Sequence, residues 1–133
     1  MPSSSCYCIL LRKASRRLSA RYDEALEPFG INIGQFSQMR NIRRNEPLSL
    51  TDLATIMELD RSTVGRNTKV LERMGLVETV TGEDQREALL QLSKEGRALL
   101  KAAEPVWEDV QVKIDERLGE DMTGQLKQLL DVL

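Results

Sequence analysis

The chain lacks histidine and has few aromatic and cysteine residues. Its 133 residues include no His, two Cys, one Trp, two Tyr and two Phe. Without His, the Ser-His-Asp and Cys-His nucleophile systems and every His metal site are excluded. Two thiols are too few for an all-Cys zinc site within one chain. With only 4% aromatic residues, the core is expected to consist mainly of Leu, Ile, Val, Met and Ala.

Long apolar runs and a secretory signal are also missing. No stretch approaches the ~18–20 apolar residues that span a bilayer. The first residues, Met-Pro-Ser-Ser-Ser, lack the basic-then-apolar pattern of a secretory signal. We therefore expect one domain over residues 1–133, located in the cytoplasm and away from membranes, with free thiols and with no metal or other cofactor.

The charges are unevenly distributed although the net charge is only −2. Three groups of bases occupy the first part of the chain: residues 12–21, residues 40–44 and residues 61–73. From Glu104 onward, eight acids stand against three bases. A globally acidic protein still binds a polyanion when its bases share a face, because charges act over only about 8–10 Å. The alternative is that these runs are solvated helix faces.

Apolar spacing predicts helices at both ends of the chain. A helix is expected over residues 9–26, ended by Pro28 and Gly30, and a second one over 34–43. Ser93 is expected to cap a long helix that Pro105 kinks or restarts, with a last helix after Gly119. In so short a chain, the apolar stripes of residues 7–28 and 94–133 have little to pack on except each other and a second copy. These segments are therefore predicted to form a dimerisation layer.

Residues 49–75 predict a helix-turn-helix. Ser49 followed by Asp52 is typical of a helix start, and Glu58-Leu59 is the expected turn. Asp60 is the expected N-cap of a second helix over 61–74, which Gly75 ends in a left-handed conformation.

The second of these helices has two distinct faces at about 100° per residue. One face carries Val64, Thr68 and Leu71. The opposite face carries Ser62, Arg66, Lys69 and Arg73, flanked by Thr63 and Gly65, and has no acid. Hydroxyls and bases are the groups that contact phosphates and base edges in a major groove. A short, solvated polar helix is the plainer alternative.

A β-hairpin is expected directly after this helix. Residues 77–81 and 88–92 read as strands, joined by a turn over residues 82–85. Such a hairpin is a wing, and Arg86 at its tip is suited to an adjacent minor groove. Asp84 is expected to brace the wing, although a salt bridge between Asp84 and Arg86 that only stiffens the loop is the alternative.

Two segments carry a resemblance to a known family. Residues 53–77, LATIMELDRSTVGRNTKVLERMGLV, and residues 83–96, EDQREALLQLSKEG, resemble the helix-turn-helix and wing of the MarR family of bacterial transcriptional regulators. The resemblance extends from about Leu10 onward. It implies a mainly α fold with a small β-hairpin wing, a winged helix-turn-helix over about 31–92, and a homodimer joined by the terminal helices.

The resemblance also implies a function and its residues. Ser62, Thr63, Arg66 and Lys69 fall on the recognition-helix contacts of the family, and Arg86 falls on its wing arginine. Control by a small phenolic or lipophilic effector, or by an oxidant, is implied as well. Three departures are Gly65 in place of Thr or Ser, Asn67 in place of an apolar residue, and Glu78-Thr79 in place of arginines.

The two cysteines form a Cys6-x-Cys8 pair at the start of the first helix. Residues i and i+2 of a helix point about 200° apart, so an internal disulfide requires a frayed turn. A thiol is more reactive at a helix N-terminus or near a base. Cys8 is expected at the start of a helix, and Arg12 lies one turn after it. By resemblance to the organic-peroxide sensors of the family, Cys8 matches the reactive cysteine and Tyr22 one of two tyrosines that hold it; Ile33 replaces the second. The alternative is that Cys8 is an apolar filler of the dimer layer.

The sequence thus predicts a homodimeric, sequence-specific regulator of transcription that binds double-stranded DNA. We expect a ligand- or oxidation-responsive repressor on a pseudo-palindromic operator. The alternative is a winged-helix interaction module that dimerises and binds protein or ligand without DNA. An enzyme is not expected, since His and a phosphate-binding glycine loop are both absent.

Overall fold

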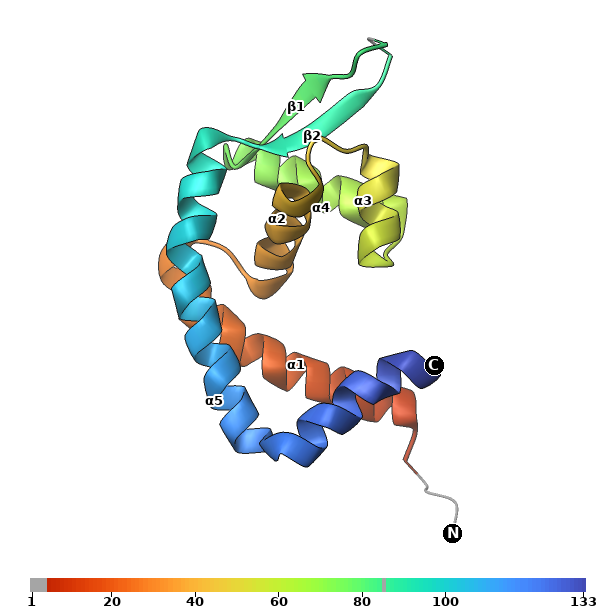
Figure 1. Cartoon of the computed structure of the whole chain (residues 1–133), viewed down its shortest axis with the longest axis vertical. Helices are drawn as coiled ribbons and strands as arrows, with labels where there is room; N and C mark the ends of the chain where they lie inside the picture. Colours follow the sequence, from red (N-terminus) through yellow and green to blue (C-terminus); the bar gives the residue numbers. More distant parts are fainter. Residues whose placement is uncertain (1–4, 85) are drawn as a thin grey trace.

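The computed structural model describes residues 5–84 and 86–133 and is mainly helical. Figure 1 shows a compact head that carries a hairpin, a long helix along one side, and a layer formed by the two ends of the chain. The predicted fold class, mainly α with a small β-hairpin wing, is confirmed. The elements are α1 (Tyr7–Leu26), η1 (Glu27–Phe29), α2 (Ile33–Asn45), α3 (Leu50–Met57), α4 (Arg61–Arg73), β1 (Val77–Thr81), β2 (Ala88–Leu92) and α5 (Lys94–Val132).

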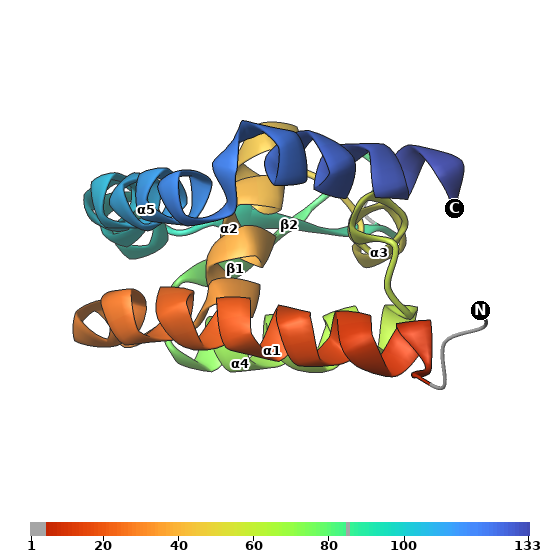
Figure 2. The ribbon, with the colours of Figure 1, turned by 90° about the horizontal axis from the view of Figure 1, so that it is seen from below.

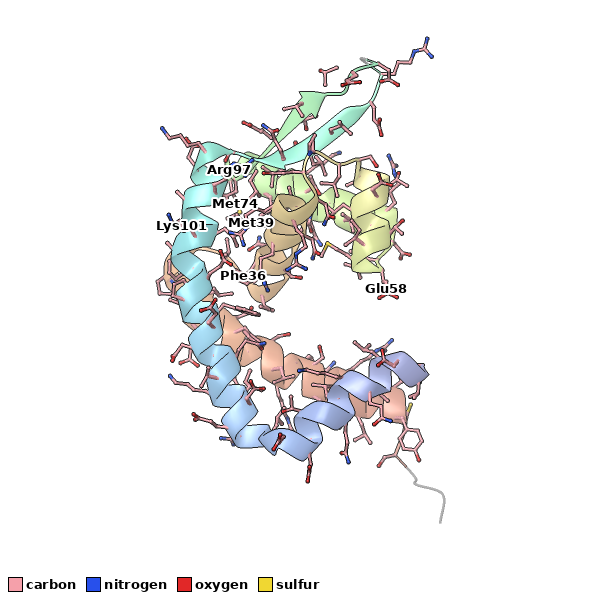
Figure 3. The ribbon with its side chains drawn as sticks, viewed as in Figure 1. Phe36, Met39, Glu58, Met74, Arg97 and Lys101 are labelled. Carbon is pink, nitrogen blue, oxygen red and sulfur yellow. The ribbon has the colours of Figure 1, made fainter. Side chains whose placement is uncertain are left out.

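The head packs α2, α3, α4 and the hairpin around an aliphatic core. Phe36 and Met39 lie on the side of α2 that faces α5 (Figure 3), and both are fully buried. The other large side chains of this core are mostly aliphatic, as the composition predicts: Leu26, Ile42, Leu53, Val64, Leu71, Leu92 and Leu100.

The helix ends follow local sequence signals. The Ser49 hydroxyl accepts a hydrogen bond from the N–H of Asp52, which confirms the predicted start of α3. Gly75 has a φ of 77° and follows the last turn of α4, as predicted. The turn between α3 and α4 is formed by Glu58, whose φ is 54°. A capping box between Asn32 and Gln35 begins α2 and was not predicted.

The hairpin is anchored to the head at its base. Strands β1 and β2 are antiparallel, with Val77 opposite Leu92 and Thr81 opposite Ala88. The backbone of Leu48 exchanges two hydrogen bonds with Leu90, of 3.2 and 2.7 Å. The chain before α3 therefore holds β2, while the tip extends beyond the head.

Helix α5 continues through Pro105, so the predicted restart there is wrong. Pro105 removes one backbone N–H from the helix, and the proline itself is exposed. The interruption occurs instead at Gly119, where φ is 81° and ψ is 162°, so the predicted break at this glycine is confirmed.

The two ends of the chain project to the same side of the molecule (Figures 1 and 2). Both carry exposed apolar side chains, at Tyr7, Ile9, Leu10, Leu11, Met122, Leu126, Leu130, Val132 and Leu133. These belong to the segments predicted to dimerise. Within residues 5–84 and 86–133, no helix combines the length and apolarity that crossing a bilayer requires.

Helix α5 begins against the loop that follows α4. Ser93 caps α5 by accepting from the N–H of Gly96, and its hydroxyl donates to the carbonyl of Gly75 over 2.6 Å. A Cβ at Gly96 would lie 2.0 Å from the carbonyl oxygen of Leu76. Only glycine therefore permits this approach of α5 to the start of the wing.

We predict that Gly96→Ala destabilises the protein by at least about 2 kcal/mol, because a backbone carbonyl must move to admit the methyl group. The matched control is Gly34→Ala in the first turn of α2, where a Cβ would meet Asn32 Oδ1 at an ordinary 3.4 Å. Urea unfolding followed by circular dichroism measures both. Equal stability of the two variants would contradict the prediction.

Candidate DNA interface

Helix α4 presents one buried and one solvent-facing side, as the sequence predicts. Val64, Thr68 and Leu71 are buried against the head. The predicted contact residues Ser62, Arg66, Lys69 and Arg73 are exposed, and Thr63 is half-buried. The structure thus gathers the predicted hydroxyls and bases along one open side of one helix.

Local contacts order the start of α4. Asp60 occupies the N-cap position as predicted, but its side chain makes no capping hydrogen bond to the described residues. Arg61 Nε instead donates to Thr51 Oγ1 over 3.1 Å, which ties α4 to α3. The Arg61–Thr51 contact was not predicted, although Arg61 belongs to the basic group at residues 61–73. Arg66 Nη2 donates to Thr63 Oγ1 over 3.4 Å.

The tip of the wing is organised by Asp84. Its Oδ1 accepts from the backbone N–H of Arg86 over 3.0 Å and of Glu87 over 3.3 Å. These bonds reach backbone amides, so they leave the Arg86 guanidinium available to project from the tip. Gln85, part of the predicted turn, lies outside the described residues.

A groove of about 740 Å³ separates α3 and α4 from the wing. Three bases line it: Arg61 and Lys69 from α4, and Arg86 from the wing. Ser49, Thr51 and Thr79 line it as well, and so do three acids, Asp52, Glu72 and Glu87. The groove lies between α4 and the wing. Arg66 and Arg73 are on the exposed side of α4 and do not line the groove. The bases on α4 and the wing are donors of the kind that contact phosphates, and the acids stand beside them in the same groove.

Carboxylates border the same surface. Glu72 Oε1 accepts from Thr79 Oγ1 over 3.3 Å, and Glu78 Oε1 accepts from Gln91 Nε2 over 2.7 Å. Both acids lie toward the hairpin side of the interface. They place negative charge beside the strand at which the resemblance led us to expect arginines.

A second cavity, of about 270 Å³, lies between α1, α2 and α5. The guanidinium of Arg40 stacks on the ring of Trp107 at 4.3 Å from the centroid, and Phe36 stacks on Trp107 at 5.5 Å. Arg40 Nε is buried and has no hydrogen-bond partner within residues 5–84 and 86–133. The remaining lining is mainly polar and includes Tyr22, Ser37, Asn41, Arg44 and Gln111. Sequence reasoning did not identify the residues that line this cavity, because its walls come from distant segments.

Two ion pairs connect the head to α5. Arg43 donates to both oxygens of Glu104, over 2.6 and 2.9 Å, and this hydrogen bonding lowers the pKa of Glu104. Arg97 pairs with Glu46, whose second oxygen accepts from the N–H of Leu92 over 2.9 Å. The end of α2 is thereby joined to α5 and to the base of the wing.

The predicted redox residues lie on α1, apart from the open side of α4. Cys6 is the N-cap of α1 and Cys8 lies in its first turn; both thiols are free and exposed. Tyr22 is near the other end of α1, and its hydroxyl donates to Gln111 Oε1 of the same chain. Burial, followed by the charge of Asp115, raises the pKa of Tyr22.

Comparison with known proteins identifies the family. A model described as the MarR family matches residues 31–88. YwoH of Bacillus subtilis strain 168, named an uncharacterized HTH-type transcriptional regulator, is 31% identical over 121 residues, which cover 89% of this chain and 83% of that protein. The chain belongs to the MarR family.

Solved structures share the whole architecture. The transcriptional regulator MosR of M. tuberculosis, solved in complex with DNA, is 32% identical and has a TM-score of 0.81, with 96% of this chain and 98% of that chain covered. The S. aureus MepR–DNA complex, 22% identical with a TM-score of 0.83, covers 98% of this chain and 100% of its own and shows the same fold.

This MarR-family chain is therefore a winged helix-turn-helix transcriptional regulator. The alternative of an interaction module that acts without DNA is not favoured, since DNA complexes stand among the structural neighbours. YwoH and MosR are both named transcriptional regulators.

Proposed function

We propose that the protein is a homodimeric repressor that acts in the cytoplasm on a pseudo-palindromic operator. The observation that carries the proposal is the open side of α4, where hydroxyls and bases stand exposed above a buried apolar side. Two such helices, related by the twofold axis of a dimer, enter successive major grooves about 34 Å apart.

The contact residues divide by chemistry. Arg66 and Lys69 suit the acceptor edge of guanine, and Ser62 and Thr63 suit either bases or phosphates. Arg73, at the end of α4, is placed for backbone phosphate. On the wing, Arg86 enters the neighbouring minor groove while Asp84 holds the loop that carries it.

The dimer forms through the terminal segments, residues 7–28 and 94–133. Exposed apolar side chains on α1 and on the last turns of α5 point to this interface, since a solvated monomer gains nothing from exposing them. The winged helix-turn-helix at residues 31–92 then stands clear of the dimer layer.

We predict that Arg66→Ala and Arg86→Ala each weaken operator binding by about 5- to 100-fold and leave the dimer intact. Gel shifts on a duplex selected from a random pool measure affinity, and analytical ultracentrifugation measures the dimer. Affinity of the wild-type protein is also expected to fall steeply with salt.

The matched control is Lys101→Ala, which removes one positive charge from the exposed outer side of α5 (Figure 3). It is expected to bind the operator as the wild-type protein does. Full affinity in both arginine variants, or a monomeric wild-type protein, would overturn the proposal.

The cavity between α1, α2 and α5 is proposed to bind the effector. Its flat wall of Phe36, Trp107 and the Arg40 guanidinium suits a planar ring, and the unpaired Nε of Arg40 is a donor for a phenolic oxygen. The cavity of about 270 Å³ is sized for a small phenolic or lipophilic molecule.

Trp107 is the single tryptophan of the chain, so its fluorescence reports on this cavity. We predict that simple phenols quench it saturably and lower operator affinity, and that Arg40→Met loses the quenching because stacking and donor are removed. Lys101→Met changes an exposed base on the same helix as Trp107 that does not line the cavity, and is the control. Quenching by phenols that is identical in Arg40→Met and wild type would contradict the assignment.

Oxidation is the second proposed signal. Cys8 lies in the first turn of α1, one turn before Arg12, which is a setting that favours a reactive thiol. In this step the Cys8 thiolate attacks a peroxide oxygen and becomes a sulfenic acid, while the peroxide is reduced to water or an alcohol.

We predict that peroxide lowers the operator affinity of the wild-type protein and of Cys6→Ser but not of Cys8→Ser, and that dithiothreitol restores it. Gel shifts before and after treatment, with mass spectrometry of the thiols, provide the measurement. Operator affinity that peroxide leaves unchanged would remove the sensor hypothesis.

A further inference from the structure

Two polar side chains are buried between α2 and the recognition helix. Gln38 is 1% exposed and Thr68 is 3% exposed, and both lie within the aliphatic core of the head. Buried polar groups are expensive unless they find partners. Their presence on the inner side of α4, where Val64 and Leu71 are apolar, therefore calls for a reason beyond stability.

The two side chains form one directed hydrogen-bond chain. The Thr68 hydroxyl donates to the carbonyl of Val64 over 2.7 Å, so its oxygen is left as an acceptor. Gln38 Nε2 donates to that oxygen over 2.7 Å and also lies 3.5 Å from the Val64 carbonyl. Because the hydroxyl proton is already engaged, the amide must be the donor across the interface.

This contact constrains α4 in a way that its apolar contacts do not. Hydrophobic packing by Val64 and Leu71 is non-directional and tolerates small rotations of a helix about its axis. A hydrogen bond requires both a short distance and alignment of the donor. Thr68 lies between Arg66 and Lys69 in the sequence, so fixing Thr68 fixes the directions in which these two bases leave the helix.

We propose that Gln38 is a positioning residue for DNA recognition, which sets the rotation of α4 through Thr68 so that Arg66 and Lys69 meet base edges. This inference rests on the proposed function of α4. Replacing a buried polar pair by apolar groups of similar shape is often close to neutral for stability. In this protein, such a replacement removes the constraint that holds α4 in the single orientation required for reading bases.

The test compares specific with non-specific DNA. We expect Gln38→Met, which keeps the length of the side chain and removes the donor, to reduce the ratio of affinities for the selected operator and a scrambled duplex by about tenfold. The slope of affinity against salt is expected to stay unchanged, because the phosphate contacts survive. The Gln38→Met/Thr68→Val variant, which leaves no unpaired partner, is expected to behave in the same way.

Two further variants separate orientation from packing. Thr68→Ser keeps the acceptor and is expected to keep the affinity ratio, whereas Thr68→Val loses it. Thr55→Val is the matched control, because the Thr55 hydroxyl bonds the carbonyl of Thr51 within α3. Thermal unfolding of each variant accompanies the binding data, and Thr68→Ser gives a result even if the double variant does not fold.

A wild-type affinity ratio in Gln38→Met would overturn the inference, as would an equal loss in Thr68→Ser and Thr68→Val. If the wild-type protein itself prefers no duplex over another, the proposed function fails and this inference fails with it. If the wild-type protein and Gln38→Met both discriminate fully between the operator and the scrambled duplex, only the role of Gln38 is refuted and the proposed function stands.

Discussion

The packing of α4 against α2 is the constraint on which the rest of the interface depends. The bases of α4 project usefully only if its inner side is held in one orientation, and that side is held by Val64, Leu71 and the bond from Gln38 to Thr68. Apolar burial supplies most of the stability, and the buried amide adds direction.

Helix α2 also makes the contacts that connect the head to α5. Phe36 and Arg40 form part of the wall of the cavity against Trp107, and Arg43 pairs with Glu104 of α5. Gln38 lies on the opposite side of the same helix from Arg40, about 200° away around its axis. A movement of α2 at the cavity wall would therefore act on α4 through this directed contact.

Short-range signals made much of this fold predictable. The Ser49 cap, the Gly75 stop and the bounds of the two strands all depend on residues a few positions apart, and the Asn32–Gln35 capping box was recognisable by the same rule. The two faces of α4 followed from helical periodicity alone.

What the sequence did not reveal is long-range. Gln38 and Thr68 are 30 residues apart, and Arg43 and Glu104 are 61 apart, so no periodicity links them. A lone Gln in a helical segment reads as a surface residue. The cavity escaped prediction for the same reason, since α1, α2 and α5 each supply part of its wall. The predicted restart at Pro105 was wrong because the cost of a proline inside a helix depends on its exposure, which the sequence does not state.

The carboxylates beside the interface increase the importance of how the bases of α4 are oriented. Non-specific affinity grows with the number of phosphates that a surface neutralises. Asp52, Glu72 and Glu87 line the groove beside its bases and oppose that gain, in a protein whose net charge is −2. A surface of this kind gains less from counterion release than a uniformly basic one, so more of its affinity must come from contacts that are correctly aimed. The hydrogen bond from Gln38 to Thr68 orients α4, and the acids reduce non-specific attraction to DNA. Both therefore act on the difference in affinity between correct and incorrect DNA sites.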